Sequence, residues 1–250
     1  PVSPLPRASP TSRWQATPLL DFNGWSCSAD CAYHCMWRIT SIRQAQGQTV
    51  LQYHGKWPFA RLFGMQEPVA AMASLVNGLV HLAGLLRCWQ LMAAVPSGWL
   101  WRVFGLLSVN AWLWALVFHC RDVYWTQCAD YFSATLLVGG AALVAAHHLA
   151  ETYGRAAGRA SSATVVALAL AAYGEHVRRM LRHFDYGAHL RLNVALGAVH
   201  QLLWLLWWWR ARARRGGAVC DGAPRAMHVP RRSAATIQAT RTNEASRRMK

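Results

Sequence analysis

Five apolar blocks constrain this chain more than any other feature of its sequence. A transmembrane helix needs roughly 20 consecutive apolar residues, and each block approaches that length, with most of the charge lying in the loops between them. The pattern predicts an all-α membrane protein, a multi-spanning helical bundle with about five spans. The predicted spans cover about 69–91, 98–118, 130–150, 160–177 and 190–209.

The composition bears on two alternative classes. Charged residues make up 14% of the chain and there are 14 Trp, whereas soluble domains carry roughly 25% charged residues, so a soluble α-helical protein is disfavoured. The formal net charge is +16, which raises the possibility of a nucleic-acid partner. However, residues 210–250 hold 11 Lys or Arg against 2 acids, a net +9. A basic tail beside a span is typical of membrane orientation, so we expect no nucleic acid.

The chain divides into four predicted segments. Residues 1–20 are polar and Pro-rich and are predicted to be disordered, 21–67 form a Cys-containing segment, 68–210 form the transmembrane bundle, and 211–250 form a basic disordered tail. The sequence opens at Pro1 without a visible signal peptide, and we expect a removed signal or a fragment.

Cationic loops predict the orientation in the membrane. If the spans alternate, basic residues around 87–102, 155–159 and 210–215 share one side, which the positive-inside rule makes cytoplasmic. The Cys-containing segment then lies in the lumen, together with His119. Arg178 and Arg179 also fall on the lumenal side, against the rule.

Three cysteines are spaced by four residues in the lumenal segment. On a helix, Cys27, Cys31 and Cys35 would share one face. Zinc binding is possible, but disulfides in an oxidising compartment fit better, although three thiols cannot all pair among themselves. Cys120 and Cys128 flank the central loop and are a further candidate pair.

The stretch 110–134 carries the candidate chemistry. An apolar run ends in His119, and the polar loop after it holds Asp122 and Asp130. An imidazole and two carboxylates between facing helix ends can form a site. The alternative is structural: His119 at the membrane interface, Asp122 paired with Arg121, and Asp130 as a helix N-terminal charge.

Four separated blocks resemble the Per1-like family and occur in its order. They cover roughly residues 25–210, and a chance match to all of them is very improbable. The blocks are Trp25–Trp37, His54–Phe59 with Phe63–Pro68, Asn110–Ala134, and Phe184–Gly187 with Asn193–Gly197.

The resemblance implies a seven-span protein of the secretory pathway, within a superfamily of zinc hydrolases that includes alkaline ceramidases and adiponectin receptors. Carried over by motif, His119 is the expected metal ligand and catalytic residue, and Asp130 the second catalytic residue. Asp122 is expected to orient the loop through Arg121. The family's Ser four residues before the His is replaced here by Ala115.

A late His-x3-His pair is also implied by the resemblance, and it would complete a zinc site. Residues 211–250 contain one His, His228. His147 and His148 are adjacent and fall on the cytoplasmic side, whereas His183 and His189 are expected in a lumenal loop. His54 is a reserve candidate for the site, although a position at the membrane interface explains it more simply.

The implied function is remodelling of glycosylphosphatidylinositol (GPI) anchors by phospholipase A2-like removal of the unsaturated sn-2 acyl chain, with zinc as cofactor. GPI lipid and GPI-anchored proteins are the expected partners, and the Golgi or endoplasmic reticulum membrane is the expected location. A non-catalytic membrane protein that binds GPI lipids or protein partners is the alternative. A channel or transporter would need charges within its spans, for which Glu175 is the main candidate.

Overall fold

The computed structural model describes residues 18–220, with the side chains of 155–163 and 215–220 excepted. By its internal contacts the chain forms two units, residues 1–206 and 207–250. Within the described range the regular structure is helical, apart from two isolated β-bridges. The predicted all-α class is confirmed.

Two short N-terminal elements precede five long helices. The first two are α1 (Pro18–Phe22) and α2 (Cys27–Ala45). Ser26 caps α2, because its hydroxyl accepts a hydrogen bond from the Ala29 amide at 3.2 Å. The long helices are α3 (Pro68–Ala94), α4 (Gly98–Cys120), α5 (Tyr124–Glu151), α6 (Arg155–Arg182) and α7 (Tyr186–Cys220).

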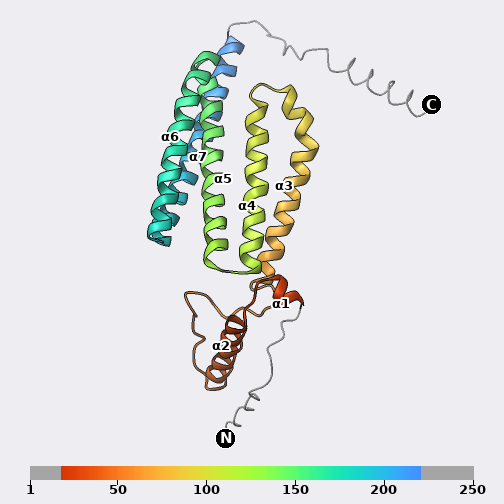
Figure 1. The fold of residues 1–250 in the computed structure, drawn as a ribbon. Helices are drawn as coiled ribbons and strands as arrows, with labels where there is room; N and C mark the ends of the chain where they lie inside the picture. Colours follow the sequence, from red (N-terminus) through yellow and green to blue (C-terminus); the bar gives the residue numbers. More distant parts are fainter. Residues whose placement is uncertain (1–17, 221–250) are drawn as a thin grey trace, which may run out of the picture. The chain divides into compact units, whose positions relative to one another are not determined.

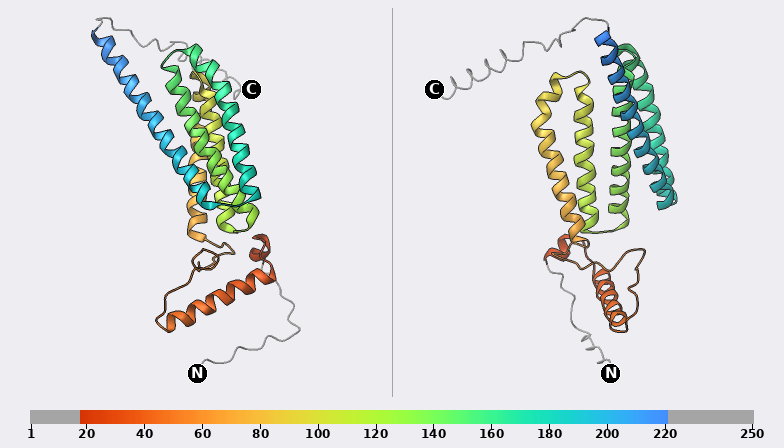
Figure 2. Two further views of the ribbon diagram at one scale, coloured as in Figure 1. Left: turned by 90° about the vertical axis from the view of Figure 1, so that its left-hand side faces the viewer. Right: turned by 180° about the vertical axis from the view of Figure 1, so that it is seen from behind.

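Short connections make α3, α4, α5 and α6 antiparallel neighbours in sequence order. Helices α3, α4 and α5 lie side by side in this order (Figures 1 and 2), and α6 packs on α5. Where these helices touch, small side chains let the backbones approach closely, as is common between membrane helices. The buried small residues of α3 and α4 include Ala71, Ser74, Ser108 and Ala111.

Four of the long helices are long and apolar enough to cross a membrane. They are α3, α4, α5 and the Tyr186–Arg214 part of α7. Large apolar side chains such as Leu79, Val80 and Leu86 are exposed on α3, a surface that suits lipid better than water. The chain is therefore an all-α, multi-span membrane protein.

The predicted fourth span, 160–177, differs from the other four. A helix does cover it, α6, but among the described residues α6 is not one of the helices that meet the length and hydropathy needed for a span. Its C-terminal half carries Glu175, whose carboxylate accepts hydrogen bonds from both Arg178 and Arg179. These charges shorten the apolar stretch.

Two predicted boundaries also move. The third predicted span begins at 130, but α5 already begins at Tyr124. The hydroxyl of Thr126 explains this earlier start, since it accepts from the Val123 amide at 3.0 Å and donates to the Arg121 carbonyl at 2.8 Å. At the other end, α7 continues to Cys220, into the segment predicted to be disordered. The rest of that segment, and residues 1–17, lie outside the described residues.

The cysteine-bearing segment is helical as expected. Cys27, Cys31 and Cys35 lie at intervals of one helical turn on α2, and all three thiols are free and exposed. Cys120 and Cys128 are free thiols as well. Disulfide formation by the α2 cysteines in cells stays a prediction.

Candidate functional site

A tight turn at residues 53–56 positions Lys56, the first charged residue of the candidate site. Tyr53 and Lys56 exchange backbone hydrogen bonds of 2.7 and 3.0 Å. The two residues between them, His54 and Gly55, have φ values of 50° and 80°, as a type I′ turn requires. The turn sends Lys56 back toward the bundle.

A second turn of the same kind anchors the segment to α1. Residues 62–65 form it, with φ values of 50° at Phe63 and 77° at Gly64. The indole of Trp25 donates to the Gly64 carbonyl at 2.8 Å. A Cβ on Gly64 would lie 2.7 Å from the Leu19 carbonyl oxygen, so both the conformation and the close approach require glycine.

The residues after this turn satisfy the C-terminal end of α4. The amides of Gln66 and Glu67 donate to the carbonyls of Cys120 and His119, both at 2.9 Å. The last carbonyls of a helix have no partner within the helix, so this pairing caps α4. It also places the Glu67 side chain beside the His119 side chain.

Glu67 and His119 form the centre of the candidate site. The Nδ1 atom of His119 lies 2.8 Å from the Oε2 atom of Glu67. Burial raises the pKa of Glu67, but the hydrogen bond with His119 and the charge of Lys56 outweigh burial and hold that pKa below its ordinary value. A carboxylate on Nδ1 fixes the ring and leaves Nε2 as its second functional atom.

Lys56 joins two carboxylates. Its ammonium lies 3.4 Å from Glu67 Oε1, forms an ion pair with Asp122, and sits 4.5 Å from the centre of the Phe118 ring. The expected pairing of Asp122 with Arg121 is therefore wrong in one respect: Arg121 donates to the backbone carbonyl of Asp122 at 3.2 Å, while the carboxylate binds Lys56.

Trp25 stacks with two arginines. The guanidinium of Arg121 lies 4.2 Å from its ring and that of Arg61 lies 4.4 Å from it. Arg61 is held in turn by Asp30 on α2, at 2.7 Å. Burial lowers the pKa of Arg121, and the charge of Arg61 lowers it further, although Asp122 opposes both. The stack connects α2 to the connection between α4 and α5.

The predicted site residues come together only in part. His119 lies in the last turn of α4 and Asp122 in the connection after it. Asp130 does not open a helix, because it lies within α5 beyond the first turn. It is half-buried and within electrostatic range of both His119 and Lys56. The reserve candidate His54 is exposed, in the first turn.

The other histidines considered from the sequence lie elsewhere. His147 and His148 cluster with Glu151, and His147 Nε2 lies 2.8 Å from the hydroxyl of Ser97. His189 is not in a loop as expected. It is buried within α7, and its Nδ1 lies 3.2 Å from Nε2 of His176.

The described residues supply an incomplete set of ligands for the expected zinc ion. Within the described part of the chain, no group of three or more His, Cys, Asp or Glu side chains is placed so that it could hold a metal ion. His119 supplies one imidazole, with Glu67 behind it. The described residues therefore do not fit a zinc site by themselves.

Sequence reasoning missed Glu67 and Lys56. Both lie in the quoted blocks His54–Phe59 and Phe63–Pro68, and an acid directly before an apolar span was the available signal. What the sequence did not show was the approach to His119, which is 52 positions further along the chain.

Comparison with known proteins adds the family. The family model described as the Per1-like family matches residues 18–242. The chain belongs to the Per1-like family. No solved structure matches it significantly.

Curated relatives carry informative names. A zebrafish (Danio rerio) protein named GPI-specific phospholipase A2-like PGAP3 is 39% identical over 78% of this chain and 61% of its own length. The human relative of the same name is 39% identical over 74% of this chain and 57% of its own length. A Drosophila melanogaster relative, named post-GPI attachment to proteins factor 3, is 33% identical over 76% of this chain and 58% of its own length. The chain thus spans less than two thirds of each of these relatives.

Proposed function

We propose that this Per1-like chain takes part in GPI-anchor lipid remodelling, as the His119-bearing part of a hydrolase that removes the sn-2 acyl chain from the phosphatidylinositol of GPI anchors. One observation carries the proposal: the pairing of His119 with Glu67 at the end of an apolar helix, in a chain related to proteins named GPI-specific phospholipase A2-like. GPI lipid and GPI-anchored proteins are the proposed partners.

The chemistry follows from the two side chains. The Glu67 carboxylate accepts a hydrogen bond from the Nδ1–H group of His119 and orients the ring, so that Nε2 can take a proton from a water molecule. The water oxygen bonds to the acyl carbon, the bond from that carbon to the glycerol oxygen breaks, and His119 returns the proton to the leaving alkoxide. Lys56 supplies positive charge beside the pair, and Asp130 lies within electrostatic range of His119.

Position supports the substrate class. His119 lies at the end of α4, a helix apolar enough to cross a membrane. The ester groups of a lipid lie at the boundary between acyl chains and head groups, which is the depth of such a helix end. We place the site on the lumenal side of the Golgi or endoplasmic reticulum membrane, in agreement with the charge distribution of the loops.

The test is direct acyl release. The chain, reconstituted in vesicles that contain a GPI lipid with an unsaturated sn-2 chain, is expected to release that fatty acid and leave a lyso-GPI, both identified by mass spectrometry. Binding of the GPI lipid without acyl release would contradict hydrolysis. Release of the sn-1 chain would contradict the assigned position.

A further inference from the structure

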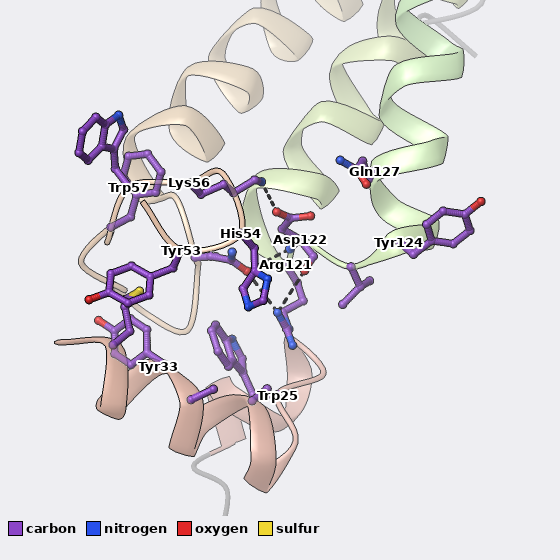
Figure 3. A pocket seen from close by; sticks show the side chains of 16 residues that line it. Trp25, Tyr33, Tyr53, His54, Lys56, Trp57, Arg121, Asp122, Tyr124 and Gln127 are labelled. Atoms are coloured by element: carbon purple, nitrogen blue, oxygen red, sulfur yellow. Dashed lines mark hydrogen bonds and ion pairs between the residues drawn. The ribbon is translucent and has the colours of Figure 1, made fainter. Parts of the chain in front are cut away.

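A cavity of about 550 Å³ lies next to the Glu67–His119 pair. It is lined by α2, the segment around 53–59, the connection between α4 and α5, and the start of α5 (Figure 3). Its volume falls within the range of about 300–1,000 Å³ that is usual for small-molecule sites. Neither His119 nor Glu67 lines it, whereas Lys56 and Asp122 do.

Aromatic rings dominate the lining. Seven of the lining side chains are aromatic or imidazole rings: Trp25, Tyr33, Tyr53, His54, Trp57, Phe59 and Tyr124. Two of them, Trp57 and Tyr124, are more than half exposed. Exposed rings at or beyond the end of a span present flat faces to a ligand in water. The C–H faces of sugar rings stack on such surfaces.

Polar groups between the rings include a donor without a partner. The Nε atom of Arg121 is buried and has no hydrogen-bond partner among the described residues. The amide side chains of Gln66 and Gln127 also line the cavity. A buried donor of this kind calls for an explanation, and a ligand rich in hydroxyl groups would supply an acceptor.

The cations of the cavity already have partners within the protein. Lys56 is bound by Glu67 and Asp122, and Arg121 donates to Gln66 at 3.2 Å. An anionic group would have to compete with these partners. The ring faces and the buried Nε donor of Arg121 therefore favour the hydroxyl-bearing rings of a carbohydrate over an isolated phosphate.

We propose that this cavity binds the carbohydrate head group of the lipid substrate, with sugar rings stacked between the aromatic side chains. The inference rests on the proposed function for the identity of the lipid. The head group of a membrane lipid extends into water beyond its ester groups, and the cavity adjoins the helix end that holds His119. The cavity would thereby select glycosylated lipids.

Two substitutions test the cavity without disrupting its frame. His54→Asn removes a lining ring, but Asn tolerates positive φ and Asn-Gly is a favoured pair in type I′ turns. Trp57→Ala removes an exposed ring. The matched control is Trp125→Ala, since Trp125 is 59% exposed and does not line the cavity.

The probe is a water-soluble inositol glycan prepared from a GPI anchor by removing its lipid, titrated against the full chain in detergent by calorimetry. Saturable binding is expected, weakened by about fivefold or more in His54→Asn and Trp57→Ala, as for aromatic hot spots, and unchanged in Trp125→Ala. Absent binding, equal affinity in all three variants, or equal competition by inositol phosphate without sugars would overturn the inference.

The probe carries no acyl ester, so its binding is measured independently of hydrolysis. Glycan binding without acyl release would leave this inference standing and remove the proposed hydrolysis. Acyl release without glycan binding would do the reverse.

Discussion

Glu67 and His119 lie 52 positions apart in the sequence, yet the Oε2 atom of one is 2.8 Å from the Nδ1 atom of the other. The contact exists because the amides before α3 cap the C-terminal carbonyls of α4. The same backbone pairing that completes a helix end thus delivers a carboxylate to an imidazole. The candidate site depends on this docking.

The Glu67–His119 contact should stabilise the protein in a pH-dependent way. The pKa of Glu67 is lowered in the folded chain from its ordinary value of 4.5, so the carboxylate contributes stability above about pH 4.5 and loses it as pH falls through the lowered pKa. In detergent, the unfolding temperature of the wild type should exceed that of Glu67→Gln at pH 7. The difference between the two unfolding temperatures should close toward pH 3. A gap that widens on acidification would contradict the assignment.

The second turn should tolerate substitution less well than the first. Gly64→Ala introduces a Cβ into the left-handed region, which costs about 1–2 kcal/mol, and also forces it against the Leu19 carbonyl at 2.7 Å. Gly55→Ala is the matched control, because its φ is 80° but no atom lies within 4 Å of the added Cβ. Unfolding of the two variants should show the larger loss of stability for Gly64→Ala. Equal losses would argue against docking on α1.

Substitutions at Ser97 should separate two effects on stability, the strain of a positive φ angle and the loss of hydrogen bonds. It has a positive φ of 57° and donates to Glu151 at 2.9 Å. Ser97→Ala keeps the strain and loses the contacts, at about 1–3 kcal/mol, whereas Ser97→Gly loses the contacts but relieves the strain. We expect Ser97→Gly to be the more stable variant by about 1 kcal/mol. The reverse order, measured by thermal unfolding, would show that the strain is negligible.

The cysteines of α2 report both sidedness and redox state. If α2 faces the lumen, at least two of Cys27, Cys31 and Cys35, which are free and exposed thiols in the described structure, should be oxidised in cells. Alkylation of freshly lysed, unreduced membranes should then modify at most one of the three. Complete modification of all three thiols would refute the lumenal assignment, while Cys88 offers an internal reference thiol on α3.

Local patterns predicted the helices, whereas the long-range pairings required the structure. The apolar run of 98–118 matches α4 to within two residues of its end, since span length is set by a continuous apolar stretch. The start of α5 was missed because the hydroxyl of Thr126 caps a turn that is not itself apolar.

The composition of the candidate site shows the same division. His119 was identified from its block, but the partners of Asp122 and His119 were not, because Lys56 and Glu67 reach them across the contact between the 53–67 segment and the end of α4. Periodicity carries information about neighbours along one helix. Ion pairs between segments follow from how those segments dock.

The central claim is that His119, oriented by Glu67, carries out ester hydrolysis. Its most direct test measures release of the sn-2 fatty acid from a GPI lipid by three variants, in a chimaera where this segment replaces the matching part of the zebrafish relative. His119→Ala should lower the rate by about 10²–10⁴-fold and Glu67→Gln by roughly 10- to 100-fold. The control His34→Ala should be unchanged, since His34 is exposed on α2. Full activity of His119→Ala would contradict the account.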